Sequence, residues 1–371
     1  MVKGRRAVES VEIVPFAGAY RGRRVLITGH TGFKGSWLAF WLSKLGAQVT
    51  GLALAPAAQP NHWNEISACA TNICADIRDL EAITRAIEAC RPDIVFHLAA
   101  QTLVRESYQQ PLTSWSTNVM GTANVLEACR RAPSVEAIVV VTTDKVYANQ
   151  EWPWGYREND RLGGHDPYSA SKAAAELVAD SYRKSFFHQD NPPLVATVRA
   201  GNVFGGGDWA AGRLIPDVVR ARYAGQPLEI RSPMSVRPWQ HVLECLSGYL
   251  MLGHRLLEGD AACASAWNFG PPPTDCRTVS ELLQSMKRHW PELAWKTADK
   301  PELHEAGLLS LDCAKAHREL GWSPTLSLDE SLALTAQWYR HFHETAETLT
   351  EVQLEYYVDA ASRRHRAWNP Q

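Results

Sequence analysis

The sequence predicts an α/β fold in which a doubly wound, Rossmann-like parallel sheet is followed by a smaller, mixed C-terminal lobe. Three observations support this prediction. Short apolar segments alternate with helix-like segments through the first half of the chain, a glycine-rich turn follows the first apolar segment, and the elements become shorter and richer in glycine and proline after Arg199. Alternating strands and helices are typical of a parallel sheet that helices cover on both faces.

The expected strands are short aliphatic runs of the kind that is buried on both faces of a parallel sheet. They are residues 24–28, 48–54, 72–75, 94–98, 137–142 and 194–199. The expected helices are 35–45, 80–90, 113–132, 168–188 and, near the C-terminus, 349–362. We therefore expect these parts: an N-terminal extension (1–20), a sheet domain (21–200) on which 242–265 packs back, a lobe (201–241 and 266–345) and a C-terminal tail (346–371).

The composition is that of an ordinary soluble protein. The 371 residues are 45% apolar and 21% charged, and the formal net charge is −2, so neither a nucleic acid nor a membrane surface is expected as partner. The Arg-rich opening lacks the apolar run of a secretory signal, and no apolar run approaches the length of a membrane span. The eight cysteines form no C-x-x-C pair. We expect reduced thiols in a cytoplasmic protein, and no metal site or disulfide framework.

The turn after the first expected strand has the context of a dinucleotide-binding loop. Gly29, Gly32 and Gly35 follow the strand and open a helix. Glycines allow a tight turn and let the backbone approach a pyrophosphate, and the free N–H groups at the helix start attract the anion. The expected cofactor contacts are Gly29, Thr31, Gly32, Phe33, Lys34 and Gly35. Lys34 could approach a phosphate or could be solvated.

The residues do not by themselves decide between NAD and NADP. Residues 50–56, after the second strand, contain neither the acidic residue that binds the ribose in NAD enzymes nor an Arg that would bind the phosphate of NADP. Asp76 and Ile77 follow the third strand and could hold the adenine. Alternatively, Asp76 belongs to the N-cap region of the helix at 80–90.

Tyr168 and Lys172 form a candidate acid–base pair. Residues four apart share a helical face, so the Lys172 ammonium can lie beside the Tyr168 phenol. A positive charge there favours the phenolate and is expected to lower the pKa of the tyrosine, as a general base requires.

A second candidate group comes where the fifth expected strand ends, in Thr142, Thr143, Asp144 and Lys145. In open α/β sheets, ligands bind at the carboxyl ends of the strands, so these side chains could handle protons on a substrate. The alternative is an ordinary strand-to-loop transition with exposed charges. The expected cofactor cleft further includes Leu98, Ala99, Ala100, Asn118 and Thr142. We expect His97 to be packed and not catalytic.

Taken together, several segments resemble the nucleotide-sugar 4,6-dehydratases of the extended short-chain dehydrogenase/reductase family, in particular the branch that acts on CDP-glucose. The resemblance runs from Gly29 to Pro271 and continues more weakly to about His343. It rests on "TGHTGFKGSWL", "EWPWGYRENDRLGGHDPYSASK", "VRAGNVFGGGDW" and "SVRPWQH". The tryptophan-rich segments are the most specific part.

The resemblance implies NAD as cofactor, CDP-glucose as substrate and an internal redox cycle. Tyr168 would take the C4 hydroxyl proton during oxidation, with Lys172 and Thr143 beside it. Asp144 would act as acid for the C6 oxygen. Lys145 stands where the dTDP-glucose branch has glutamate, so the base at C5 is open; a role in stabilising the enolate is favoured over a role as base.

The resemblance also assigns a substrate site and a partner. Asn202 and Arg237 match positions near the diphosphate, and Asp208, Trp209, Leu214 and Ile215 match the nucleotide-binding stretch, although Asp208 could only brace its loop. Leu308 stands where the family has a tyrosine. The helices at 113–132 and 168–188 are expected to pair across a homodimer as a four-helix bundle.

Two rival functions remain. One is a 4-epimerase or a dehydratase for another nucleotide sugar; an epimerase needs no acid at C6, so Asp144 argues against it. The other is a catalytically silent dinucleotide-binding sensor, which need not keep Tyr168 and Lys172.

Overall fold

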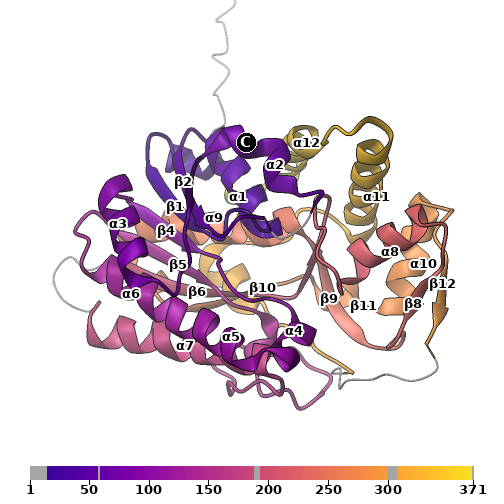
Figure 1. The fold of residues 1–371 in the computed structure, drawn as a ribbon, viewed down its shortest axis with the longest axis horizontal. Coiled ribbons are helices and arrows are strands. Elements are labelled where there is room, and N and C mark those ends of the chain that lie inside the picture. The colour runs from indigo at the N-terminus through magenta and orange to yellow at the C-terminus, as the bar shows by residue number, and fades with distance from the viewer. Residues whose placement is uncertain (1–14, 57–58, 188–192, 299–306, 370–371) are drawn as a thin grey trace, which may run out of the picture.

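The centre of the molecule is a seven-stranded parallel sheet (Figure 1). The computed structural model describes residues 15–56, 59–187, 193–298 and 307–369. The strands of this sheet are β1 (Arg24–Thr28), β2 (Gln48–Ala53), β3 (Thr71–Cys74), β4 (Ile94–His97), β5 (Ala137–Val141), β6 (Leu194–Ala200) and β10 (Ala266–Phe269). Their order is β10-β6-β5-β4-β1-β2-β3, and every neighbouring pair is parallel. The predicted doubly wound sheet, with its six expected strands, is confirmed.

β10 corrects the predicted division of the chain. Residues 266–269 were expected in the C-terminal lobe, but β10 pairs with β6 as the edge strand of the central sheet. The error arose because the chain leaves the sheet after β6, builds part of the lobe and returns only about 65 residues later.

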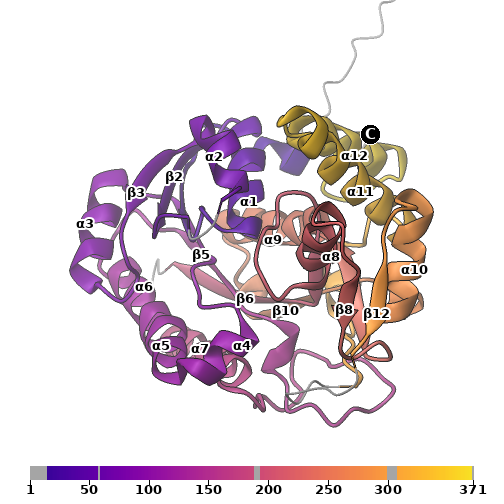
Figure 2. The ribbon, with the colours of Figure 1, turned by 45° about the vertical axis from the view of Figure 1, so that its right-hand side comes forward.

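Both faces of the sheet are covered by helices, as an all-parallel sheet requires. α1 (Phe33–Lys44) and α9 (Val242–Leu257) lie on one face, and α3 (Leu80–Cys90), α6 (Gly121–Arg130) and α7 (Pro167–Ser185) lie on the other (Figure 2). The strands alternate accordingly: Val25 and Ile27 enter the first core, and Leu26 enters the second.

The single helix expected at 113–132 is interrupted. It consists of α5 (Pro111–Trp115), a π-helical segment (Ser116–Met120) and α6. α6 begins at Gly121, which lies against Ile77; a Cβ there would come within 2.5 Å of the Ile77 side chain. Further short helices are α2 (His62–Ile66) and α4 (Val104–Gln109). The helix expected at 168–188 is α7, and its last expected residue lies outside the described residues.

In the described part of the C-terminal lobe there are two small sheets and three α-helices. β7 (Asn202–Phe204), β9 (Val236–His241) and β11 (Cys276–Thr278) form the first sheet, and β8 (Leu228–Ile230) and β12 (Trp295–Thr297) form the second. The helices are α8 (Leu214–Tyr223), α10 (Val279–His289) and α11 (Leu328–Thr345). Figures 1 and 2 show this lobe beside the carboxyl-end loops of the central sheet.

The two ends of the described chain meet on α1. The C-terminal helix α12 (Thr350–Arg363) confirms the helix expected at 349–362. Beyond it, the Trp368 ring stacks on Phe16 and contacts Trp41, and the Phe16 amide donates to the Trp368 carbonyl. The buried Trp368 side chain makes the C-terminal tail part of the hydrophobic core. Of the predicted N-terminal extension, residues 1–14 lie outside the described residues.

Some expectations concern the molecule as a whole. Among the helices of the described chain, none combines the length and apolarity needed to cross a membrane. All eight cysteines are unpaired. Within the described ranges, no cluster of three or more His, Cys, Asp or Glu side chains could hold a metal ion.

Candidate active site

A cleft of about 1700 Å³ lies where the carboxyl ends of the central strands face the lobe. Of the predicted cofactor contacts, it is lined by Gly29, Thr31, Gly32, Phe33, Lys34, Gly35, Asp76, Ile77, Leu98, Ala99, Ala100 and Thr142. Of the predicted catalytic and substrate residues, it is lined by Thr143, Asp144, Lys145, Tyr168, Lys172, Asn202, Asp208, Leu214, Ile215 and Arg237. The structure therefore brings together, in one cleft, residues that are up to 208 positions apart in the chain, from Gly29 to Arg237.

The glycine loop is a cradle that side chains would fill. Gly29 has a φ of +80°, and a Cβ there would lie 2.6 Å from the Ala99 amide nitrogen. A Cβ on Gly35 would lie 2.2 Å from the Gly29 carbonyl oxygen. The N-cap of α1 is Gly32, which has no side chain to occupy the first free N–H groups of the helix. This geometry fits a pyrophosphate, as required for the NAD predicted from the sequence.

An ion pair between Asp76 and Arg78 lines the cofactor side of the cleft. Asp76 accepts two hydrogen bonds from the Arg78 guanidinium, which lowers the pKa of Asp76, and both residues line the cleft. The N-cap of α3 is Asp79, and Asp76 braces the turn that leads to it, because its Oδ1 accepts from the Arg78 amide and its carbonyl accepts from the Asp79 amide. The interpretation of this segment as an N-cap region is therefore confirmed, and it does not exclude a contact of Asp76 with the adenine. Arg78 was not anticipated, although it lies two residues from Asp76 in the sequence.

Tyr168 is buried at the N-terminal end of α7, where it is hydrogen-bonded to Thr143. Burial raises the pKa of Tyr168 to about 12, so the expected lowering is not found in the protein alone. Lys172 lies one turn further along the same helix and donates to the Val141 carbonyl at 2.8 Å. Burial, aided by the charge of Lys34, lowers the pKa of Lys172 to about 8.

Asp144 has the environment of a carboxyl group that binds its proton more tightly than usual. Its side chain is buried, and its Oδ1 accepts a hydrogen bond from Thr143 Oγ1 at 3.0 Å. Asp144 Oδ2 is also buried and has no hydrogen-bond partner among the described residues. Burial raises the pKa of Asp144, in the direction that was predicted; the charges of Lys145 and Arg237 act against this rise.

Arg213 is a cleft residue that the sequence analysis missed. Its Nη1 donates to both carboxylate oxygens of Asp208, at 3.1 and 3.0 Å, and its Nη2 donates to Thr102 Oγ1 at 3.1 Å. Arg213 therefore links the lobe to the loop that follows β4, and its charge faces Tyr168. It directly precedes Leu214, so its position beside a predicted substrate residue was the available signal.

Two predicted site residues do not line the cleft. The Asn118 amide is buried between the chain at Gln101 and the hydroxyl of Ser171, so it braces the cleft wall. Trp209 packs into the lobe against Trp338, Tyr339, Phe342 and His343 of α11. In both cases the side chain contacts residues of a distant segment and not the cleft: Asn118 is hydrogen-bonded to Ser171, and Trp209 packs on α11.

Two further expectations concern neighbouring residues. His97 is buried and hydrogen-bonded to Thr28 and Thr122, as expected of a packed residue. Leu308, at the family's tyrosine position, forms a β-bridge with Val236, whereas the next residue, Leu309, lines the cleft. The "HEA" segment before it lies outside the described residues.

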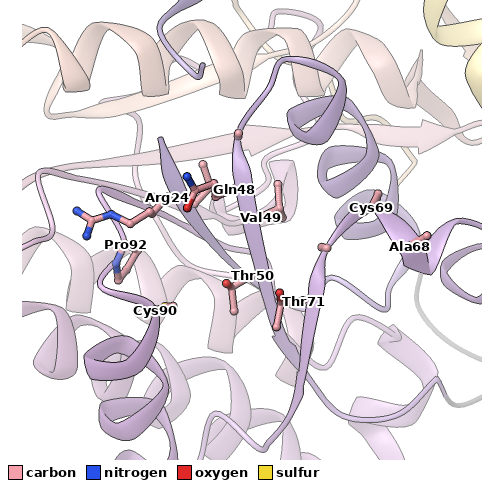
Figure 3. Close-up of a pocket in the computed structure, with 12 residues that line it drawn as sticks. Arg24, Gln48, Val49, Thr50, Ala68, Cys69, Thr71, Cys90 and Pro92 are labelled. Carbon is pink, nitrogen blue, oxygen red and sulfur yellow. The ribbon is translucent and has the colours of Figure 1, made fainter. Parts of the chain in front are cut away.

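A second hollow, of about 550 Å³, lies at the opposite edge of the sheet, near the N-terminal ends of β1 and β2 (Figure 3). Its lining includes Arg24, Thr50, Cys69 and Cys90. The Arg24 guanidinium is already paired with Asp93. None of the predicted site residues lies there, so the cleft at the carboxyl ends is the candidate active site.

Comparison with known proteins agrees with this geometry. Residues 25–263 match the model of the NAD dependent epimerase/dehydratase family. The chain belongs to this family. A CDP-glucose 4,6-dehydratase from Salmonella typhimurium is 47% identical over 328 residues, which are 86% of this chain and 91% of that protein. A dTDP-glucose 4,6-dehydratase from Xanthomonas campestris is 28% identical over 85% of this chain and 92% of its own.

Solved structures of the family share the fold. The dTDP-glucose 4,6-dehydratase DesIV from Streptomyces venezuelae, crystallised with NAD, superposes with a TM-score of 0.75 at 27% identity, covering 86% of this chain and 98% of that one. A UDP-glucose 4-epimerase from Thermus thermophilus in complex with NAD has a TM-score of 0.75 at 25% identity, with coverages of 85% and 99%. The family, the fold and the use of NAD are thereby established for this chain.

Proposed function

We propose that this protein is a CDP-glucose 4,6-dehydratase, which converts CDP-D-glucose to CDP-4-keto-6-deoxy-D-glucose and water. The proposal is supported by the 47% identity to the Salmonella enzyme across most of both chains. The observation that carries the reaction type is the buried, unpartnered Asp144 Oδ2 in a cleft that also contains Tyr168 and Lys172.

NAD bound in the glycine cradle would accept a hydride from C4 and return it at C6. Tyr168 Oη takes the proton of the C4 hydroxyl, and Thr143, which is hydrogen-bonded to the phenol, orients the same oxygen. The phenol alone has a pKa of about 12, so the positive charges around the cleft must favour the phenolate when the reactants are bound. Arg213 already acts on the phenol in this direction, and Lys172, one helical turn from Tyr168, lines the same cleft.

Elimination then requires a proton donor and a group that stabilises negative charge. The C4 ketone acidifies C5, whose proton passes to a water molecule or another base of the cleft, and the C6 oxygen leaves as water when Asp144 gives it a proton. The raised pKa of Asp144 keeps that proton available. C5 takes up a proton again when the hydride reaches C6. Lys145 lines the same cleft and stabilises the enolate oxygen at C4 as an ammonium. Asn202 and Arg237, which line the cleft, are the residues that we assign to the diphosphate.

A 4-epimerase is the second candidate, because UDP-glucose 4-epimerases share the fold. An epimerase oxidises and reduces the same carbon, so it has no use for a protonated acid. Asp144 therefore favours the dehydratase.

We also infer that the protein is a homodimer. Large apolar side chains are exposed on α5, on the segment between α5 and α6, and on α7 with its C-cap, namely Leu112, Trp115, Met120, Leu177 and Phe186. Leu112 is 81% exposed and Leu177 is 60% exposed. Such a patch on neighbouring helices suits a second copy of the chain. In sedimentation experiments, Leu177→Glu should shift the protein to monomer, and an unchanged dimer would contradict this interface.

The proposed function is tested with a panel of CDP-glucose, dTDP-glucose, UDP-glucose and GDP-mannose. Only CDP-glucose should lose one water efficiently, as measured by the mass of the product. Equal or better turnover of another nucleotide sugar would refute the substrate assignment, and conversion to CDP-galactose without loss of water would favour the epimerase. The cytoplasmic location stays a prediction.

A further inference from the structure

A buried ion pair lies directly behind the catalytic turn, which we define as Thr143–Val146. Glu176 on α7 and Arg199 on β6 are both 3% exposed, and their side chains join at 2.9 and 3.0 Å. Neither side chain lines the cleft. The proposed mechanism gives them no role, and the sequence analysis did not single them out.

Glu176 is connected to the residue that precedes the turn. Thr142 Oγ1 donates to Glu176 Oε1 at 2.5 Å, and Thr197 Oγ1 donates to Glu176 Oε2 at 2.6 Å. With the two bonds from Arg199, the carboxylate has four donors around it. The position of Thr142 is thus fixed from α7 and not only by the pairing of β5.

Arg199 is connected to the residue that follows the turn. Its Nη1 donates to Tyr147 Oη at 2.8 Å and to the Glu158 carbonyl at 2.9 Å. Tyr147 Oη in turn donates to Asn268 Oδ1 at 2.7 Å. The ion pair therefore holds both ends of the catalytic turn, through Thr142 on one side and Tyr147 on the other.

Stability alone does not explain such a pair. Removing two charges from water is costly, and apolar side chains of similar volume often stabilise a core as well or better. A network of directed hydrogen bonds, in contrast, fixes atoms to within the tolerance that catalysis demands.

Glu176 also faces the charge of Lys172, because it lies four residues further on the same buried side of α7. The other charged or titratable groups that act on Lys172 are Lys34 from the glycine loop and His97 from β4. Those that act on Glu176 are Arg199 and, more weakly, Arg183. The Glu176 carboxylate acts against the lowering of the Lys172 pKa that burial and Lys34 cause.

We propose that Glu176 is a positioning residue for the dehydration: with Arg199 it holds the catalytic turn in place, and its carboxylate supports the charge of Lys172. This inference rests on the proposed function. It assigns no contact between Glu176 and the substrate.

The test compares kcat, its pH dependence and the melting temperature in four variants. Glu176→Gln should lower kcat roughly 10²-fold, the effect of misplacing a reacting group by about 1 Å. It should also move the alkaline limb of the kcat profile to lower pH, because Lys172 loses its supporting charge. Glu176→Asp keeps the charge and should restore the limb while kcat stays low. Thr142→Val removes one link and should lower kcat with little change in melting temperature.

The double variant Glu176→Met/Arg199→Met separates positioning from stability. It should melt near the wild-type temperature and still have a kcat reduced about 10²-fold. A double variant with both wild-type melting temperature and wild-type kcat would show that the Glu176–Arg199 pair serves only stability. A Glu176→Gln enzyme with wild-type kcat and an unmoved alkaline limb would also overturn the proposal.

The matched control is Arg24→Gln/Asp93→Asn. This pair joins β1 to the start of β4 at the opposite edge of the sheet, far from the cleft. The control should change melting temperature without a shift in the pH profile; an equal shift there would remove the special role of Glu176. Wild-type enzyme that dehydrates no nucleotide sugar refutes the proposed function, whereas an active wild type with an equally active Glu176→Gln enzyme refutes only the positioning.

Discussion

Asp144→Asn should separate the two halves of the reaction. The amide keeps the shape of the side chain but has no acidic proton for the leaving oxygen. Loss of a general acid costs about 10²–10⁴-fold in rate, which corresponds to about 2.7–5.4 kcal/mol on the barrier to elimination. Oxidation at C4 depends on Tyr168 and should continue. Reduced nicotinamide should therefore build up on the enzyme after CDP-glucose is added.

The assay is the absorbance of enzyme-bound reduced nicotinamide, followed in a stopped-flow instrument beside product formation. Tyr168→Phe serves as the matched control, because it should abolish both signals. An Asp144→Asn enzyme that forms product at the wild-type rate would refute the acid role. An enzyme that forms neither product nor reduced nicotinamide, yet binds substrate, would show that Asp144 acts in the oxidation.

The same substitution should raise stability at neutral pH. Burial raises the pKa of Asp144 above its value in the unfolded chain, so the stability that the protonated acid contributes is present below the unfolded pKa and is lost as pH rises through the folded pKa. A neutral amide avoids that loss. Asp144→Asn should therefore melt higher than wild type at pH 7 and show a smaller fall in melting temperature between acidic and neutral pH. A lower melting temperature at pH 7 would contradict the buried-acid assignment.

Further outcomes are expected. Tyr168→Phe should lower turnover by roughly 10²–10⁴-fold while substrate affinity changes much less; near-normal turnover would make Tyr168 structural. Lys145→Arg should keep partial activity if the lysine stabilises the enolate, and a folded, substrate-binding but inactive enzyme would indicate a base. Gly35→Ala should abolish NAD binding in calorimetry, since its Cβ would lie 2.2 Å from the Gly29 carbonyl oxygen. Because the pKa of Lys172 is about 8, kcat should fall as pH rises through that value, and a flat profile to pH 10 would contradict this.

The sequence predicted the central sheet well because most of its first six strands are short aliphatic runs followed by an identifiable turn. β3 is the exception: its sequence is "TNIC" and it is largely exposed, because it is an edge strand and not one that is buried on both faces. β1, the glycine loop and α1 follow each other directly, so local patterning was sufficient. Residues 266–269 were assigned to the wrong part of the chain, because nothing in "AWNF" itself indicates that this segment pairs with β6 at the edge of the central sheet.

The candidate site was predictable where function depends on neighbours in the chain, as for Thr143 and Asp144 or for Tyr168 and Lys172. It was not predictable where a distant partner decides the direction of a side chain. Trp209 packs on α11, more than 120 residues later, and Asn118 binds Ser171. The pKa of Tyr168 was predicted in the wrong direction because spacing reveals the nearby ammonium but not the degree of burial.

The central claim is that the hydride removed from C4 returns to C6 of the same sugar. The most direct measurement uses CDP-glucose that carries deuterium at C4, with the product examined by NMR spectroscopy. We predict one deuterium at C6 of the 4-keto-6-deoxy product and no net consumption of NAD. A product without deuterium at C6, or one that forms only with stoichiometric reduction of added NAD, would contradict the internal redox cycle.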